Sequence, residues 1–133
     1  MKTETYDICV TGLKRLINKY IWRMDPNMPE ISVRPEALVF RYNSRKEYTT
    51  IPWSEITDIK LIKDDFGHAV MPVLKDPQKY IDACSNKFIK MGMKKSLKDD
   101  GSPFAIRVDN LSYGADDIAG MIQDYWKENG QEA

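Results

Sequence analysis

Two stretches of the chain repeat their apolar residues with the period of an α-helix. Between residues 10 and 24 apolar positions recur every three or four residues and alternate with lysine and arginine, which predicts an amphipathic helix. Residues 115–129 carry a cleaner apolar stripe, which consists of Ile118, Met121, Ile122, Tyr125 and Trp126. Asp116 and Asp117 fall in the first turn of this second helix, where the helix dipole favours negative charge.

Between these two helices the apolar period changes to two, which predicts short β-strands separated by polar turns. The expected strands cover residues 30–33, 37–42, 47–53, 56–63, 68–75 and 104–108. Residues 5–10 fit either a continuation of the N-terminal helix or one more short strand. The close spacing of the strands is typical of antiparallel hairpins.

A third helical segment precedes the last expected strand. Asp76 can cap its N-terminus, and Pro77 suits the first helical position. We expect this helix to run to about residue 90, and the pattern leaves open whether it continues past Gly92. The order of elements predicts an α+β fold, in which a strongly bent antiparallel sheet or partly open barrel is capped by the C-terminal helix.

The peptide Ile-Pro-Trp-Ser-Glu at residues 51–55 interrupts the strand pattern. Pro52 lacks an N–H group, so strand pairing must falter there. Trp53 brings a large apolar surface, and we expect it to be buried where the chain leaves the sheet. Ile56 then starts the next strand.

Four peptides resemble, in their order and spacing, bacterial PH-like domain proteins, a family of small and mostly uncharacterised proteins. These peptides are IPWSEITDI (51–59), LKDPQKYI (74–81), GSPFAI (101–106) and NL (110–111). The resemblance covers roughly residues 29–126 and implies a PH-like barrel that is capped by the C-terminal helix, with residues 77–95 as an added helix. A PH-like barrel normally has seven strands, so residues 5–10 are a candidate for the strand missing from our count.

The resemblance also guides the division of the chain. Known members often carry two membrane spans before the domain, whereas this chain has one short amphipathic segment there. We therefore assign residues 1–28 to an N-terminal helical segment packed on the domain, and residues 29–133 to the PH-like domain. The family implies no enzymatic activity that could be carried over.

Length, charge and cysteine content limit the number of domains, the kinds of partner and the compartment that we expect. The length of 133 residues fits one domain. Twenty Lys and Arg balance twenty Asp and Glu, so no overall charge attracts the chain to nucleic acid or anionic membrane. No signal peptide and no apolar stretch of membrane-spanning length is visible. With Cys9 and Cys84 read as two thiols in a reducing compartment, we expect the protein to be cytoplasmic.

Residues suited to catalysis are few. The single histidine, His68, has no second histidine or cysteine at metal-ligand spacing, so we expect a structural or surface role. A Cys–His dyad would require Cys9 or Cys84 beside His68 in space. The Asp pairs at 64–65, 99–100 and 116–117 lie at expected turns or a helix start, where aspartate is favoured for backbone reasons. We expect no catalytic residue, no metal and no cofactor.

One charge pattern stands out on the helix before the last strand. It is a row of four lysines, Lys87, Lys90, Lys94 and Lys98. If the helix continues past Gly92, they fall within about 80° of one another and could contact an anionic surface. They could equally solvate the outer face of a packed helix, and we favour this second interpretation because Asp99 and Asp100 follow directly.

These observations favour a non-enzymatic binding module that acts on another protein, as an adaptor, an inhibitor or an immunity-type protein. A membrane-surface or lipid-binding module that uses the basic helix is the alternative, and a cryptic enzyme is a remote one. We expect one protein partner and no nucleic acid, and we do not expect membrane contact. The oligomeric state stays open.

The expected partner surface is an open sheet edge together with the groove beside the C-terminal helix, since unpaired strand groups can accept an added strand. Pro72 cannot donate a ladder hydrogen bond, which points to residues 68–75 as an edge strand. The candidate partner-binding residues are Val70, Met71, Pro72 and Val73.

Overall fold

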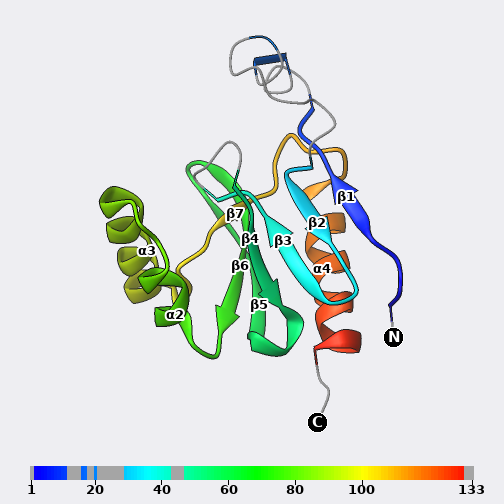
Figure 1. Ribbon diagram of the computed structural model, residues 1–133. Coiled ribbons are helices and arrows are strands. Elements are labelled where there is room, and N and C mark those ends of the chain that lie inside the picture. The colour runs from blue at the N-terminus through cyan, green and yellow to red at the C-terminus, as the bar shows by residue number, and fades with distance from the viewer. Residues whose placement is uncertain (1, 12–15, 18–19, 21–28, 43–46, 131–133) are drawn as a thin grey trace.

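The computed structural model describes residues 2–11, 16–17, 20, 29–42 and 47–130 (Figure 1). Over these residues the fold is α+β, with two antiparallel sheets of four and three strands and a helix at the C-terminal end. The helix expected over residues 10–24 lies mostly outside the described residues. No helix within the described part has both the length and the apolar content that crossing a membrane requires.

The first sheet holds its strands in chain order. They are β1 (Tyr6–Ile8), β2 (Ile31–Val33), β3 (Ala37–Phe40) and β4 (Thr49–Pro52). β1 answers the question that the sequence left open, because residues 6–8 pair as a strand with β2, with Ile8 opposite Ile31. Residues 6–8, which lie in the segment 1–28 that precedes the predicted PH-like domain, thus form an end strand of this sheet.

β2 and β3 are buried along their whole length. The alternation of polar and apolar residues in this region therefore does not separate an inner from an outer face. Arg41, which follows β3, is also buried, and its guanidinium forms an ion pair with Glu30. Such pairing is what allows an arginine to remain in the interior.

A short 3-10 helix, η1 (Trp53–Glu55), connects the two sheets. The prediction that Trp53 is buried is confirmed, since the residue is only 1% exposed. Its indole Nε1 donates a 2.7 Å hydrogen bond to the backbone carbonyl of Arg34. The polar atom of this large side chain is therefore satisfied inside the core.

The second sheet contains β5 (Ile56–Asp64), β6 (Gly67–Leu74) and β7 (Ile106–Arg107), in that order. The expectation that residues 68–75 form an edge strand is wrong, because β6 is the middle strand. It pairs with β5 along its length and with β7 at Ala69 and Val70. Farther along β6, the Ser102 hydroxyl donates to the carbonyl oxygen of Pro72. A proline is tolerated here because the neighbouring strand is only two residues long.

Two helices stand where we expected one. α2 (Pro77–Asp82) begins as predicted, with the Asp76 side chain accepting a hydrogen bond from the backbone N–H of Lys79. The chain then leaves the helical conformation, and Asn86 caps a new helix by accepting from the N–H groups of Phe88 and Ile89. A good N-cap within the segment is thus the reason for the break.

This new helix, α3 (Lys87–Asp100), runs past Gly92 without interruption. It ends at Gly101, whose φ of 85° lies in the left-handed region that glycine adopts readily. Met93 is its one buried residue, while Ile89 and Leu97 pack partly against the core. α3 therefore contacts the domain along a narrow strip and leaves most of its surface in solvent.

The C-terminal helix, α4 (Ala115–Asn129), packs against both sheets and η1. The prediction of its apolar stripe is largely confirmed, since Ile118, Ile122 and Tyr125 are buried. Met121 and Trp126 are partly buried, and the Trp126 Nε1 donates a 2.8 Å hydrogen bond to the carbonyl of Ile56. In Figure 1, α4 lies behind the first sheet, while α2 and α3 lie on the opposite side of the molecule.

Candidate functional site

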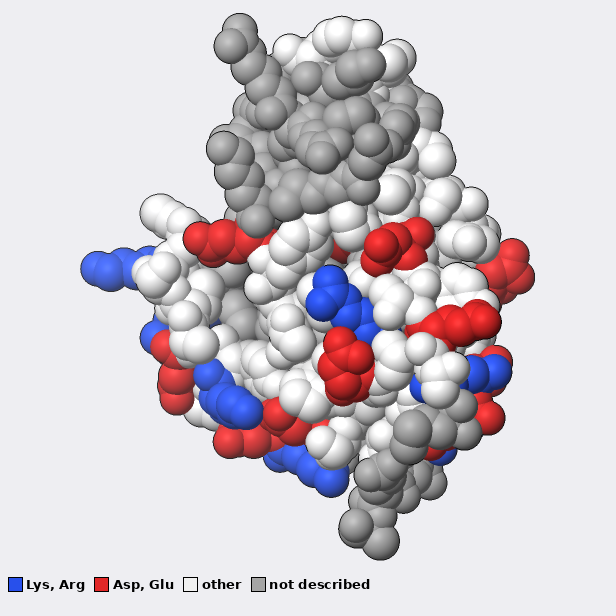
Figure 2. Space-filling view, turned by 45° about the vertical axis from the view of Figure 1, so that its right-hand side comes forward, with Lys and Arg blue, Asp and Glu red and all other residues white. Residues whose placement is uncertain are grey.

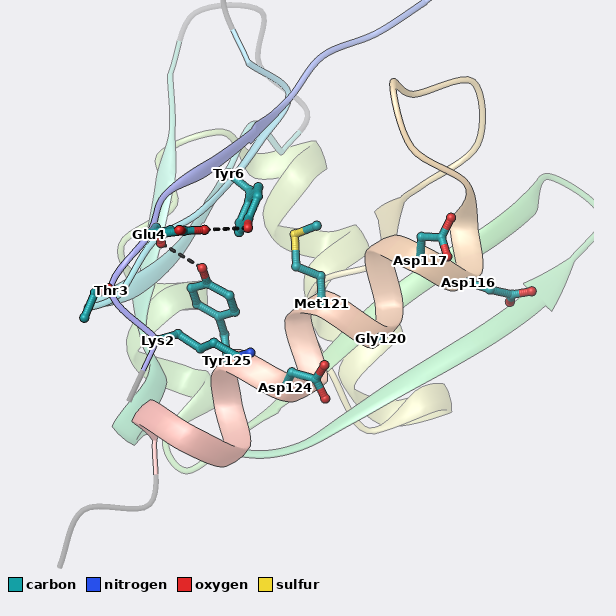
Figure 3. Close-up of a pocket in the computed structure, with 10 residues that line it drawn as sticks. All are labelled: Lys2, Thr3, Glu4, Tyr6, Asp116, Asp117, Gly120, Met121, Asp124 and Tyr125. Carbon is teal, nitrogen blue, oxygen red and sulfur yellow. Dashed lines mark hydrogen bonds between the residues drawn. The ribbon is translucent and has the colours of Figure 1, made fainter.

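A cavity of about 660 Å³ opens between the N-terminal residues 2–6 and α4 (Figure 3). We call it the α4 groove. Its lining consists of Lys2, Thr3, Glu4, Tyr6, Asp116, Asp117, Gly120, Met121, Asp124 and Tyr125. Figure 2 brings this side of the molecule forward and shows charged side chains of both signs among uncharged ones.

The N-terminal wall of the groove is held by side chains of α4. The Tyr125 hydroxyl donates a 2.8 Å hydrogen bond to the backbone carbonyl of Glu4. The Asn129 side-chain amide bonds both the backbone N–H and the carbonyl of Lys2, each at 3.0 Å. The Lys2 ammonium also lies 3.3 Å from a carboxylate oxygen of Glu128. Residues 2–4 therefore follow the C-terminal half of the helix in an extended course.

Within the part of the chain that the structure describes, no strand pairs with the side of β1 that faces away from β2. The carbonyl of Ile8 accepts from the N–H of Glu30, so the groups of Ile8 point toward β2. Because backbone groups alternate in direction along a strand, those of Asp7 point away from β2. The groups of Cys9, which point the same way as those of Asp7, are taken by Ser112. The segment that contains Ser112 continues into α4, so the outer side of residues 5–7 faces the same region as the groove.

The floor of the groove is apolar and aromatic. The rings of Tyr6 and Tyr125 meet edge to face with centroids 6.2 Å apart, and Met121 adds an apolar side chain from the preceding turn of α4 (Figure 3). The Tyr6 hydroxyl donates a 2.6 Å hydrogen bond to Glu4. This bond and the negative charge of Glu4 raise the pKa of Tyr6, so the phenol stays neutral at physiological pH.

The rim of the groove is acidic. Among the described residues, its lining includes the carboxylates of Glu4, Asp116, Asp117 and Asp124 and the ammonium group of Lys2. The helix dipole stabilises the negative charges of Asp116 and Asp117 in the first turn of α4. Asp124 lies in the helix interior, where the dipole does not stabilise its charge. An apolar floor with an acidic rim fits a ligand that carries both apolar and cationic groups.

Gly120 keeps the groove open at its centre. A Cβ atom at this position would meet no atom within 4 Å. Larger side chains can therefore be introduced here without a steric conflict inside the domain. This makes Gly120 the natural position at which to block the groove.

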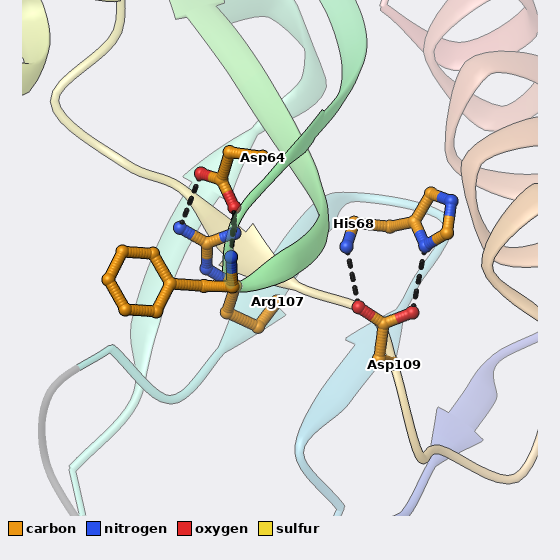
Figure 4. A network of polar contacts seen from close by, with 5 residues as sticks. Asp64, His68, Arg107 and Asp109 are labelled. Carbon is orange, nitrogen blue, oxygen red and sulfur yellow. Dashed lines mark hydrogen bonds and ion pairs between the residues drawn. The ribbon is translucent and has the colours of Figure 1, made fainter.

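A second polar cluster joins the turn between β5 and β6 to the chain after β7 (Figure 4). The Asp109 carboxylate accepts from the backbone N–H of His68 and lies 2.9 Å from its Nδ1. The hydrogen bonds from His68 lower the pKa of Asp109. Beside it, Arg107 forms a bidentate ion pair with Asp64, with distances of 2.8 and 3.0 Å.

This cluster has a structural interpretation. Four charged or polar side chains fasten the hairpin of β5 and β6 to the short strand β7, which has only two residues to pair.

The Sγ of Cys84 lies 3.6 Å from the carbonyl of Asn86, in the link between α2 and α3, and so is engaged away from His68. Across the described residues, no group of three or more His, Cys, Asp and Glu side chains is placed to hold a metal ion.

Most of the residues that we predicted to bind a partner are buried. Val70, Met71 and Pro72 are buried and Val73 is half-buried. The three buried side chains lie in the middle strand of the second sheet and are not open to a partner, whereas Val73 remains partly exposed.

The four lysines that could contact an anionic surface lie together on α3. Lys87, Lys94 and Lys98 are exposed, and Lys90 is half-buried. Sequence reasoning missed two neighbours on the same side of the helix, since Phe88 is 85% exposed and Met91 is 67% exposed. Helical spacing alone could have shown that neither of them shares the inner face with Met93.

The groove itself was only partly foreseen. The helix α4 and a neighbouring groove were expected, but the other wall is formed by Lys2, Glu4 and Tyr6, to which we assigned no role. The available signal was the alternation of Glu4 and Tyr6 at strand spacing. Comparisons of the chain with protein-family models, curated proteins and solved structures found no match.

Proposed function

We propose that this chain is a non-enzymatic binding module that contacts another protein through the α4 groove. The observation that carries the proposal is the groove's construction from an accessible strand edge, an apolar floor and an acidic rim. Each feature is one that peptide-binding surfaces use, since backbone groups supply affinity and pockets supply specificity.

We further propose that the fold is PH-like. In support, the described residues contain seven strands in antiparallel sheets of four and three, followed by a C-terminal helix. α2 and α3 stand between β6 and β7, where the resemblance implied an added helix. A small module of this kind would work in the cytoplasm as an adaptor, an inhibitor or an immunity-type protein.

A partner would engage the groove in two ways. An extended segment could pair with the outward backbone groups of β1 near Asp7 and set apolar side chains against Tyr6 and Met121. Basic side chains of the same partner would meet the carboxylates of the rim. A specific complex buries about 1,200–2,000 Å² in total, so the contact must extend beyond the groove onto its surroundings.

Site-specific photocrosslinking tests the proposal. A benzophenone amino acid replaces Gly120, and the tagged protein is irradiated in the cells that naturally contain it. We expect one discrete protein adduct. The control carries the same group in place of Phe66, which is 84% exposed in the turn between β5 and β6 and lies outside the groove.

The control position should give no such adduct. Identical adducts from both positions, or adducts from neither, would show that the groove is not a protein-contact surface. A crosslink from position 120 to a lipid or small molecule would replace the protein partner by a ligand of that class.

A further inference from the structure

The outer surface of α3 is a second unpartnered surface with a definite chemistry. We call it the α3 face, and it consists of Lys87, Phe88, Met91, Lys94, Lys95 and Lys98. All six are exposed, and at 100° per residue they fall within an arc of about 120°. Phe88 and Met91 are the two apolar members, at 85% and 67% exposure. Large apolar side chains grouped in solvent commonly mark an interaction surface.

The lysines by themselves are explained by solvation of the helix. Phe88 and Met91 are not, because burial of apolar surface is what drives folding and they take no part in it. A partner for the α3 face must therefore offer apolar surface and negative charge together. That description fits the α4 groove, with its tyrosines, Met121 and four carboxylates.

The two surfaces also match in size. α3 has 14 residues and α4 has 15, so at 1.5 Å per residue they are about 21 and 22 Å long. Methionine and aromatic side chains pack favourably against one another, and each surface offers both kinds. With a net charge of zero, copies of the chain do not repel one another at long range.

We infer that the partner of the α4 groove is a second copy of this chain, which docks its α3 face there. Because α3 is a helix, this occupant uses the apolar floor and the acidic rim of the groove and does not pair with the backbone of β1. This inference rests on the proposed function, because it names the occupant of the same groove. The two surfaces lie on opposite sides of the molecule (Figure 1), so the contact is head-to-tail. Such a contact produces closed rings where the rotation between copies returns to the start and open chains where it does not, so the assembly grows beyond a dimer in either case.

Sedimentation velocity of the purified full chain tests the inference. We expect the average mass to rise above the 15.4 kDa of one copy as the protein concentration increases in low salt. Added salt should reverse the rise, since exposed charge pairs are screened. Phe66→Ser serves as the control, because it removes an equally exposed phenylalanine from outside both surfaces, and it should assemble as the wild type does.

Two charge-reversed variants provide the decisive arm. The first variant, Asp117→Lys with Asp124→Lys, reverses two charges of the groove. The second variant, Lys94→Glu with Lys95→Glu, reverses two charges of the α3 face. Each variant alone should be monomeric. Mixed together they should associate again, because the intact groove of one variant meets the intact α3 face of the other.

Phe88→Ser and Gly120→Leu repeat the two single-surface tests without any charge reversal, so a loss of folding in one variant does not remove the test. Each should weaken association by about ten-fold or more. A wild type that stays monomeric at about 1 mM, or a mixture that stays monomeric, overturns the inference. Binding of the monomer to phosphatidylserine-rich vesicles through Phe88 would overturn it in favour of a lipid occupant.

The proposed function can be judged separately. An adduct between position 120 and a different protein, with no self-association of the purified chain, would leave the groove as a protein-binding site and remove only the second copy as its partner. Absence of any adduct would remove both.

Discussion

The hydroxyl of Tyr125 donates a 2.8 Å hydrogen bond to the backbone carbonyl of Glu4, a residue 121 positions earlier in the chain. This bond fastens the N-terminal segment to the C-terminal helix. The Tyr125 ring is 2% exposed and also contacts the ring of Trp53 at a centroid distance of 6.1 Å. One side chain therefore belongs both to the core and to the wall of the groove.

Replacing Tyr125 by phenylalanine removes this bond and leaves the ring in place. We expect Tyr125→Phe to lower the free energy of unfolding by about 0.5–1.5 kcal/mol, the net contribution of one hydrogen bond. Urea denaturation measures the change. Tyr113→Phe, at a residue that is 42% exposed, should change stability very little. Equal effects of the two substitutions would mean that the contact with Glu4 does not stabilise the fold.

Trp53 should be among the most sensitive positions in the core. Removing its side chain in Trp53→Ala leaves a large cavity, which typically costs about 3–5 kcal/mol. Trp53→Phe keeps most of the apolar volume but loses the bond to Arg34, so its cost should be clearly smaller. A melting temperature for Trp53→Ala within a degree or two of the wild type would refute the placement of this residue.

Three glycines should respond to alanine in opposite directions. Gly92 and Gly120 lie within helices, and an added Cβ meets no atom within 4 Å. Alanine at either site should stabilise the protein by about 0.5–1 kcal/mol, because glycine loses more backbone entropy on folding. Gly67 has a φ of +115°, and its Cβ would clash with the Asp109 carboxylate, so Gly67→Ala should be destabilising. The melting temperatures of the three variants, measured by thermal unfolding, test this order of stabilities.

The link between His68 and Asp109 predicts a dependence of stability on acid pH. Hydrogen bonds from His68 hold the pKa of Asp109 below its usual range, so the folded state binds this proton more weakly than the unfolded state. The carboxylate therefore stabilises the fold above the ordinary aspartate value of about 4, and this contribution is lost as the pH falls through the lower folded pKa.

Asp109→Asn should be less stable than the wild type at neutral pH, and it should lose less of its stability on acidification below about pH 4. Denaturation curves at a series of pH values test both expectations. Asp100→Asn, at an exposed position in the last turn of α3, is the control and should behave as the wild type. A variant at position 109 that follows the wild-type pH dependence would contradict the role of this pair.

The sequence correctly predicted those elements whose signal lies within a single short segment of the chain. The apolar stripe of α4 appears in 15 consecutive residues, and the ending of β4 at Pro52 follows from proline chemistry. The start of α2 was predicted by Asp76 and Pro77, and the same reasoning applied to Asn86 would have predicted the start of α3. Capping residues inside a long helical pattern thus deserve equal weight with those at its ends.

Relationships between distant segments could not be predicted in this way. β1 has three residues, too few for a periodic signal, and it forms only because β2 supplies its partner. Pro72 suggested an edge strand, but its place in the middle of the sheet depends on how far β7 extends. The groove depends on a contact between Glu4 and Tyr125 at the two ends of the chain, which no local pattern encodes.

The central claim is that the α4 groove is the protein-contact surface, and the affinity of the crosslinked partner for Gly120→Leu tests it most directly. Titration calorimetry with the purified partner, or sedimentation equilibrium if the partner is a second copy, compares this variant with the wild type and with Phe66→Ser. The account predicts binding at least about ten-fold weaker for Gly120→Leu and unchanged for Phe66→Ser. Equal affinity of all three proteins would contradict it.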